Sequence, residues 1–132
     1  MNAVPPSFTA AHAPLAPSAA SATAMRWGAL GDAGNVIAAL AGVEPDLSMP
    51  GENDFLARLS DAEEWRRERA EYGVADLAAI MEPGIAALLS VTARGADPRP
   101  AAQSLWREFV AARSAILALL PAQRDLARRP IA

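Results

Sequence analysis

The sequence predicts an all-α protein, a small bundle of three to four antiparallel helices preceded by a disordered N-terminal tail. Apolar residues recur at helical spacing in several segments, most clearly in residues 101–120. β-Branched and aromatic residues never alternate in the way that strands require. The chain has 132 residues and is 52% hydrophobic, but much of this fraction is alanine. We therefore expect one modest core within one domain.

Residues 101–120 form the longest amphipathic pattern, and we expect this last helix to be the central one. Its predicted apolar face consists of Leu105, Trp106, Phe109, Val110, Ile116, Leu117, Leu119 and Leu120. The face covers about half of the circumference, more than the roughly 100° that one core contact needs. Val110 and Leu119 lie at its two margins, so one margin is expected to remain uncovered.

The two ends of the chain are expected to lie outside the domain. Residues 1–23 are rich in Pro, Ala and Ser and have no charged residue and no apolar period, which is typical of disorder. The helical domain is expected over 24–122, followed by a short basic tail over 123–132. No basic region precedes an apolar one near the start, and no run of 18 apolar residues occurs. We therefore expect a cytoplasmic protein without a membrane-spanning helix.

The first half of the domain is expected to hold two helices. The first follows Asp32, a residue type that favours N-caps, and ends at Gly42. Trp27, ahead of this cap, is expected to anchor the tail to the core. A second helix is predicted over 53–72. A new start at Ser60 is an alternative, because Ser60 and Glu63 have capping-box spacing.

The second half is expected to hold the two strongest helices. Residues 74–92 keep one apolar phase on both sides of Pro83, which predicts a kinked helix or two collinear ones. Gly73 either joins this segment to the preceding helix or separates them. Asp97 and Pro98 are typical of a helix start, as cap and first helical residue, and predict where the final helix begins.

The composition leaves few options for chemistry. All 12 basic residues are arginine and cysteine is absent, which excludes lysine Schiff bases, thiolate nucleophiles and disulfides. The Ala, Arg and Pro bias is typical of a GC-rich, bacterial genome. His12, in the predicted tail, is the only histidine, so a nucleophile–histidine pair is not expected. We predict a non-enzymatic protein without a cofactor or metal ion.

Three weaker patterns have structural explanations. Residues 28–35 superficially resemble a phosphate-binding loop but lack its Gly-Lys-Ser/Thr ending, which favours a helix-entry loop. The arginines at 66, 67 and 69 alternate with glutamates, and the net charge is −3, so nucleic-acid binding is not expected. The acidic ridge of Asp61, Glu64, Glu68 and Glu71 is interpreted as a solvated helix face rather than a cation site.

Arg113 interrupts the apolar face of residues 101–120 and is the most unusual residue of the sequence. A guanidinium in an apolar surface is costly unless it is paired or reaches solvent. Glu82, next to Pro83, is the predicted partner in an ion pair. A site that binds an anionic ligand is the functional alternative.

These observations favour a helical protein–protein interaction or regulatory module that self-associates. An uncovered apolar margin predicts a homodimer or another protein partner, with Val110, Leu119 and Trp106 as the candidate interface. The competing structural explanation is that residues 25–49 fold over the margin. The alternative function is a small-molecule or anion-binding domain centred on Arg113.

Overall fold

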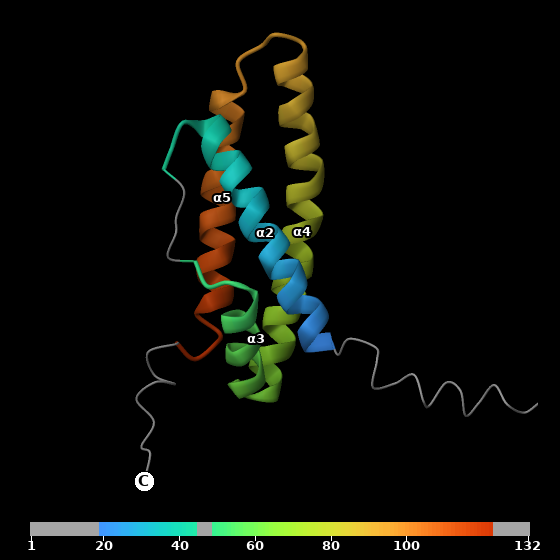
Figure 1. The fold of residues 1–132 in the computed structure, drawn as a ribbon, viewed down its shortest axis with the longest axis vertical. Coiled ribbons are helices and arrows are strands. Elements are labelled where there is room, and N and C mark those ends of the chain that lie inside the picture. Colours follow the sequence, from blue (N-terminus) through green and yellow to red (C-terminus); the bar gives the residue numbers. More distant parts are fainter. Residues whose placement is uncertain (1–18, 45–48, 123–132) are drawn as a thin grey trace, which may run out of the picture.

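The structure is a computed structural model that describes residues 19–44 and 49–122. Within these residues the chain forms a bundle of helices without strands, which confirms the predicted all-α fold (Figure 1). The helices are α2 (Ala19–Ala41), α3 (Glu52–Asp61), α4 (Glu64–Ala93) and α5 (Arg99–Leu117). His12, most of the predicted N-terminal tail and the basic tail lie outside the described residues.

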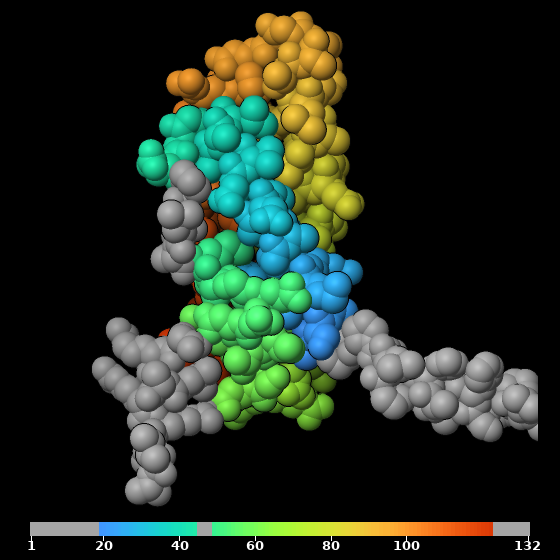
Figure 2. Space-filling view, in the orientation of Figure 1, coloured from blue at the N-terminus to red at the C-terminus, as the bar shows by residue number. Residues whose placement is uncertain are grey.

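The long helices α2, α4 and α5 lie alongside one another, and α3 covers one end (Figure 1). Helix α5 runs opposite to both α2 and α4, whereas α2 and α4 run in the same direction. Helix α2 packs against all three other helices, and with α3 it covers one face of the bundle (Figure 2). The helix at the centre is therefore α2, and the prediction that the last helix is central was wrong.

Helix α2 begins earlier than the sequence predicted. It starts at Ala19, and Thr23 and Ala24 are already buried. The predicted tail boundary at residue 23 and the predicted cap at Asp32 were therefore wrong, as was the helix-entry loop over 28–35. The start is rich in alanine, which favours helix strongly but contributes little to an apolar period.

The end of α2 matches its prediction. Gly42 follows the helix with φ 73°, a conformation that glycine adopts without strain. The N–H of Val43 donates to the carbonyl of Ala38 at 2.9 Å, and that of Gly42 to Ala39 at 3.3 Å. This pair of hydrogen bonds is the Schellman ending of a helix.

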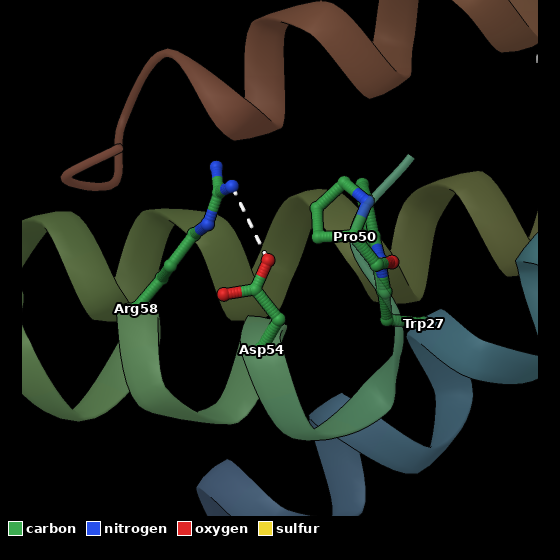
Figure 3. A network of polar contacts seen from close by, with 4 residues as sticks. All are labelled: Trp27, Pro50, Asp54 and Arg58. Carbon is green, nitrogen blue, oxygen red and sulfur yellow. Dashed lines mark hydrogen bonds and ion pairs between the residues drawn. The ribbon is translucent and has the colours of Figure 1, made fainter. Parts of the chain in front are cut away.

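Trp27 joins the middle of α2 to the start of α3 (Figure 3). The indole is fully buried and stacks on Phe55, with ring centroids 4.1 Å apart and an interplanar angle of 8°. Its Nε1–H donates to the carbonyl of Pro50 at 2.8 Å. On α3, Arg58 pairs with Asp54 one turn earlier at 3.3 Å. Trp27 therefore anchors the connection between two helices.

A break separates α3 from α4, where the sequence predicted one helix over 53–72. Ala62 and Glu63 both adopt extended backbone angles. The hydroxyl of Ser60 donates to the carbonyl of Leu56 at 3.0 Å and does not cap α4. The alternative prediction of a new helix start near Ser60 was therefore correct about the break. It was wrong about the capping box between Ser60 and Glu63. Ser60 bonds within its own helix, as hydroxyls in helices commonly do.

Helix α4 continues through Pro83, where a kink or a break was predicted, and through Gly73, where the sequence allowed either a join or a separation. It spans 30 residues, with Gly73 and Pro83 inside it. Its buried residues Val74, Leu77, Met81 and Leu88 keep the predicted apolar phase across Pro83. Because proline removes one backbone hydrogen bond, the helix is held here by packing rather than by propensity.

Helix α5 starts one residue later than predicted, at Arg99, with Pro98 rather than Asp97 as the N-cap. The N–H of Ala102 donates to the carbonyl of Pro98 at 2.8 Å, as expected for an N-cap residue. Asp97 still contributes to this end of the helix, because its Oδ1 accepts from the N–H of Arg99 at 3.0 Å. The helix ends at Leu117, and turns continue to Leu120.

Candidate functional site

The predicted interface residues separate onto two sides of α5. Trp106 lines a cavity together with residues of α2, and Val110 is partly buried against the core. Leu119 lines a groove between α4 and α5 instead. The margin of α5 marked by Trp106 and Val110 thus faces α2 and the core. The Leu119 margin lies at a surface between two helices.

The α4–α5 groove encloses about 440 Å³ and is lined mostly by apolar and small residues. Among the described residues, its lining comes from α4 and from α5 and the turn that follows it. The lining residues are Arg69, Gly73, Asp76, Leu77, Ile80, Ala112, Ala115, Ile116 and Leu119. A smaller hollow continues between the same two helices beyond Gly84, alongside Leu105 and Glu108.

Small residues give the groove its shape. A Cβ atom at Gly73 would lie 2.9 Å from Cγ1 of Ile116, and one at Gly84 would lie 2.8 Å from Cδ2 of Leu105. The two helices therefore approach closely at both glycines, in antiparallel register. Alanines at 112 and 115 cover little of the surface beside this contact. Ile80, which also lines the groove, remains 47% exposed.

On α5, the residues that line the groove and its continuation have the spacing of a helix-packing seam. Besides Ser104 and Ile116, they are Ala101, Leu105, Glu108, Ala112 and Ala115, with Leu119 in the turn after the helix, and these six follow alternating steps of four and three residues. This is the pattern with which one helix receives another. The apolar pattern of the sequence indicated Leu119 but not the seam as a whole, because three of its members are alanines.

Two opposite charges lie in the groove on α4. Arg69 and Asp76 are both exposed and are two turns apart. In the described part of the chain, neither takes part in an ion pair. The groove is thus apolar along its floor, with one positive and one negative side chain available to a partner.

Arg113 lines a different cavity, between α5, α2 and the residues before α3. This cavity encloses about 220 Å³, and its wall includes Trp27, Trp106 and Phe109. Arg113 is only 8% exposed, and its Cζ lies 5.6 Å from the centre of the Phe109 ring. A buried guanidinium beside aromatic rings can hold an anion, but it also serves structurally through cation–π contact and buried polar partners.

Glu82, the predicted partner of Arg113, is exposed on α4. Arg113 faces the cavity at α2, and the contact of Gly84 with Leu105 places Glu82 nearer to the start of α5. Any pair between the two therefore includes one solvated carboxylate, which weakens it. The pairing stays a prediction.

A double-mutant cycle with Arg113→Leu and Glu82→Gln tests this pairing. If the two side chains interact, the double variant should be more stable than the sum of the single effects, by up to about 1 kcal/mol for an exposed partner. Chemical denaturation of the four proteins measures the coupling. Strictly additive free energies of unfolding would contradict the pairing and assign the burial of Arg113 to other contacts.

The acidic ridge of Asp61, Glu64, Glu68 and Glu71 runs from the end of α3 into the first turns of α4. Within residues 19–44 and 49–122, no group of three or more His, Cys, Asp or Glu side chains is arranged to hold a metal ion. Its exposed neighbour Glu63 pairs with Arg66 at 3.4 Å, and the guanidinium of Arg66 lies 4.8 Å from the Trp65 ring.

Helix α4 is both long and apolar. In the described part of the chain, it alone is long and apolar enough to cross a membrane, judged by length and composition. Only 22% of its most apolar window is buried within the protein. Most of this window is therefore not covered by the other described helices.

Comparisons with protein-family models, with curated proteins and with solved structures gave no match.

Proposed function

We propose that this protein is a non-enzymatic helical interaction module that self-associates, with the α4–α5 groove receiving a helix of a second copy. The observation that carries the proposal is the groove itself. It is a mostly apolar channel between two closely packed helices, α4 and α5. An uncovered apolar surface of this kind usually marks a contact between proteins.

The energetics favour occupation of the groove by a helix. Ile80 alone would gain about 1–2 kcal/mol by complete burial, because about half of its surface is already covered. The seam on α5 and the exposed side of α4 together form a groove, into which the side-chain ridges of a helix from the second copy can pack. Arg69 and Asp76 would remain at the edge of such a contact, where charges select partners.

Substitution of Ile80 or Leu119 by glutamate should abolish self-association while the chain stays folded. A carboxylate in the groove would have to be buried unpaired on binding, which costs several kcal/mol. Leu89→Glu is the matched control, since Leu89 is 51% exposed on α4 and does not line the groove. Light scattering after size-exclusion chromatography measures the mass, and circular dichroism verifies the fold.

Other outcomes would identify a different function. A wild-type chain that is monomeric at all concentrations tested would contradict self-association. A monomer that instead gains thermal stability with small anions would favour the ligand site at Arg113. A chain that is monomeric in solution but binds lipid vesicles, and loses this binding with Ile80→Glu, would assign the apolar side of α4 to a membrane. Disruption by Val110→Glu but not by Leu119→Glu would move the interface to the other margin of α5.

A further inference from the structure

The outer side of α4 carries a stripe of unusually large exposed residues. Trp65 is 52% exposed, Tyr72 is 74% exposed, and Ile80 follows on the same side of the helix. Arg69 and Asp76 lie between them at steps of three and four residues. We call the set Trp65, Arg69, Tyr72, Gly73, Asp76 and Ile80 the outer stripe of α4. Four of its members also line the α4–α5 groove.

When two copies of the outer stripe are placed antiparallel, each residue faces one of complementary charge or size. The midpoint between Tyr72 and Gly73 is equally distant from Arg69 and Asp76, and also from Trp65 and Ile80. Reversal about this midpoint therefore exchanges a positive charge with a negative one and a large apolar residue with another. It also places Tyr72, the most exposed of these side chains, opposite Gly73, which has no side chain.

From this symmetry we propose that two copies of the chain pair their α4 helices antiparallel, with the two-fold axis beside Tyr72 and Gly73. Arg69 then contacts Asp76 of the second copy, and the reciprocal pair forms on the other side of the axis. Trp65 packs on Ile80 of the second copy, and Tyr72 lies beside Gly73, which is half-buried against Ile116 of its own chain. The inference rests on the proposed self-association and specifies its register.

Charge and size both favour the antiparallel arrangement over a parallel one. In a parallel pair in register, Arg69 would face Arg69, Asp76 would face Asp76, and the two Tyr72 rings would compete for one place. Like charges across a helix pair are destabilising, and opposite charges select orientation. The charges are about 5 Å from the axis along the helix, since each residue advances the helix by about 1.5 Å. Both pairs therefore form at the centre of the contact.

A charge-exchange experiment tests this register. Arg69→Asp alone should weaken self-association by about tenfold or more, because two opposite-charge contacts become two like-charge ones. Asp76→Arg should do the same for the corresponding reason. The variant with both changes should associate as well as the wild type. Arg107→Asp on the exposed side of α5 changes the net charge as Arg69→Asp does, and should have no effect.

Mixing the two single variants provides the decisive measurement. In a heterodimer of Arg69→Asp and Asp76→Arg chains, positions 69 and 76 are both acidic in one chain and both basic in the other. Position 69 of each chain faces position 76 of the other, so both contacts join opposite charges. Each variant should therefore be largely monomeric by sedimentation velocity, whereas an equimolar mixture should form dimers. Because association recovers in the mixture, neither single loss is explained by misfolding.

Different results would contradict the antiparallel pairing and the proposed self-association. If both single variants still dimerise, or if the mixture stays monomeric, the antiparallel pairing is overturned. Self-association through the groove would still hold if Ile80→Glu disrupts the dimer. If Ile80→Glu and Leu119→Glu leave the wild-type mass unchanged, or if the wild type itself is monomeric, both proposals are overturned.

Discussion

Replacement of Trp27 by alanine is expected to lower the free energy of unfolding by about 3–5 kcal/mol. The indole is fully buried, stacks on Phe55 and fills the space between α2 and the start of α3. The truncation removes the stack and leaves a cavity that the surrounding helices cannot close completely. A domain of this size has about 5–15 kcal/mol of stability in total, so much of it should be lost. Thermal and chemical denaturation measure the change.

Trp27→Phe separates the contribution of the ring from that of its hydrogen bond. Phenylalanine keeps an aromatic face against Phe55 but cannot donate to the carbonyl of Pro50. We expect a loss of about 1 kcal/mol from the missing hydrogen bond, plus a smaller packing loss. Equal effects of alanine and phenylalanine would contradict the importance of the stack.

Gly34→Ala is expected to destabilise the protein by up to about 2 kcal/mol, although alanine normally stabilises a helix. A Cβ atom at Gly34 would lie 2.7 Å from Cε2 and Cζ of Phe109. Phe109 is itself fully buried, so its ring cannot move away without disturbing the core. The steric cost of such overpacking is about 1–3 kcal/mol, which exceeds the gain of about 1 kcal/mol in helix propensity.

Gly31→Ala is the matched control on the same helix. A Cβ atom there would lie 3.8 Å from Cε of Met49, an ordinary contact with a flexible side chain. The propensity gain should then dominate, and the melting temperature should rise, with a stabilisation of about 0.5–1 kcal/mol. If both substitutions stabilise the chain to the same extent, α2 and α5 are less closely packed at Phe109 than the structure indicates.

The parts of the fold that could be predicted are those determined by residues close together in the sequence. Asp97 and Pro98 mark the start of α5 to within one residue, and Gly42 marks the end of α2 through its own backbone angle. The phase of α4 across Pro83 was predictable because large apolar side chains define it.

The start and central position of α2 were not predictable in this way. Helix α2 is buried on several sides and is built largely from alanine and glycine, so its sequence lacks a single apolar face. Gly34 leaves space for the ring of Phe109, which lies far away in the sequence. Such long-range fits leave no periodic pattern in either segment.

The candidate site was predicted only in part. Leu119 was identified because it marks the margin of a strong apolar face. Arg69, Asp76 and Ile80 were missed as a set, because Gly73 was considered a possible boundary between two helices. The outer stripe crosses that glycine, and it becomes visible only when α4 is one continuous helix.

The central position of α2 has a consequence for the synthesis of the chain. On the ribosome, α2 emerges before all three helices that cover it, since α3, α4 and α5 follow it in sequence. At about 5–20 residues per second, several seconds pass before α5 is available to pack against it. During that interval, Trp27 and Ile37 have no completed core to enter. The apolar side chains of α2 therefore stay without the helices that bury them until the last of these has emerged.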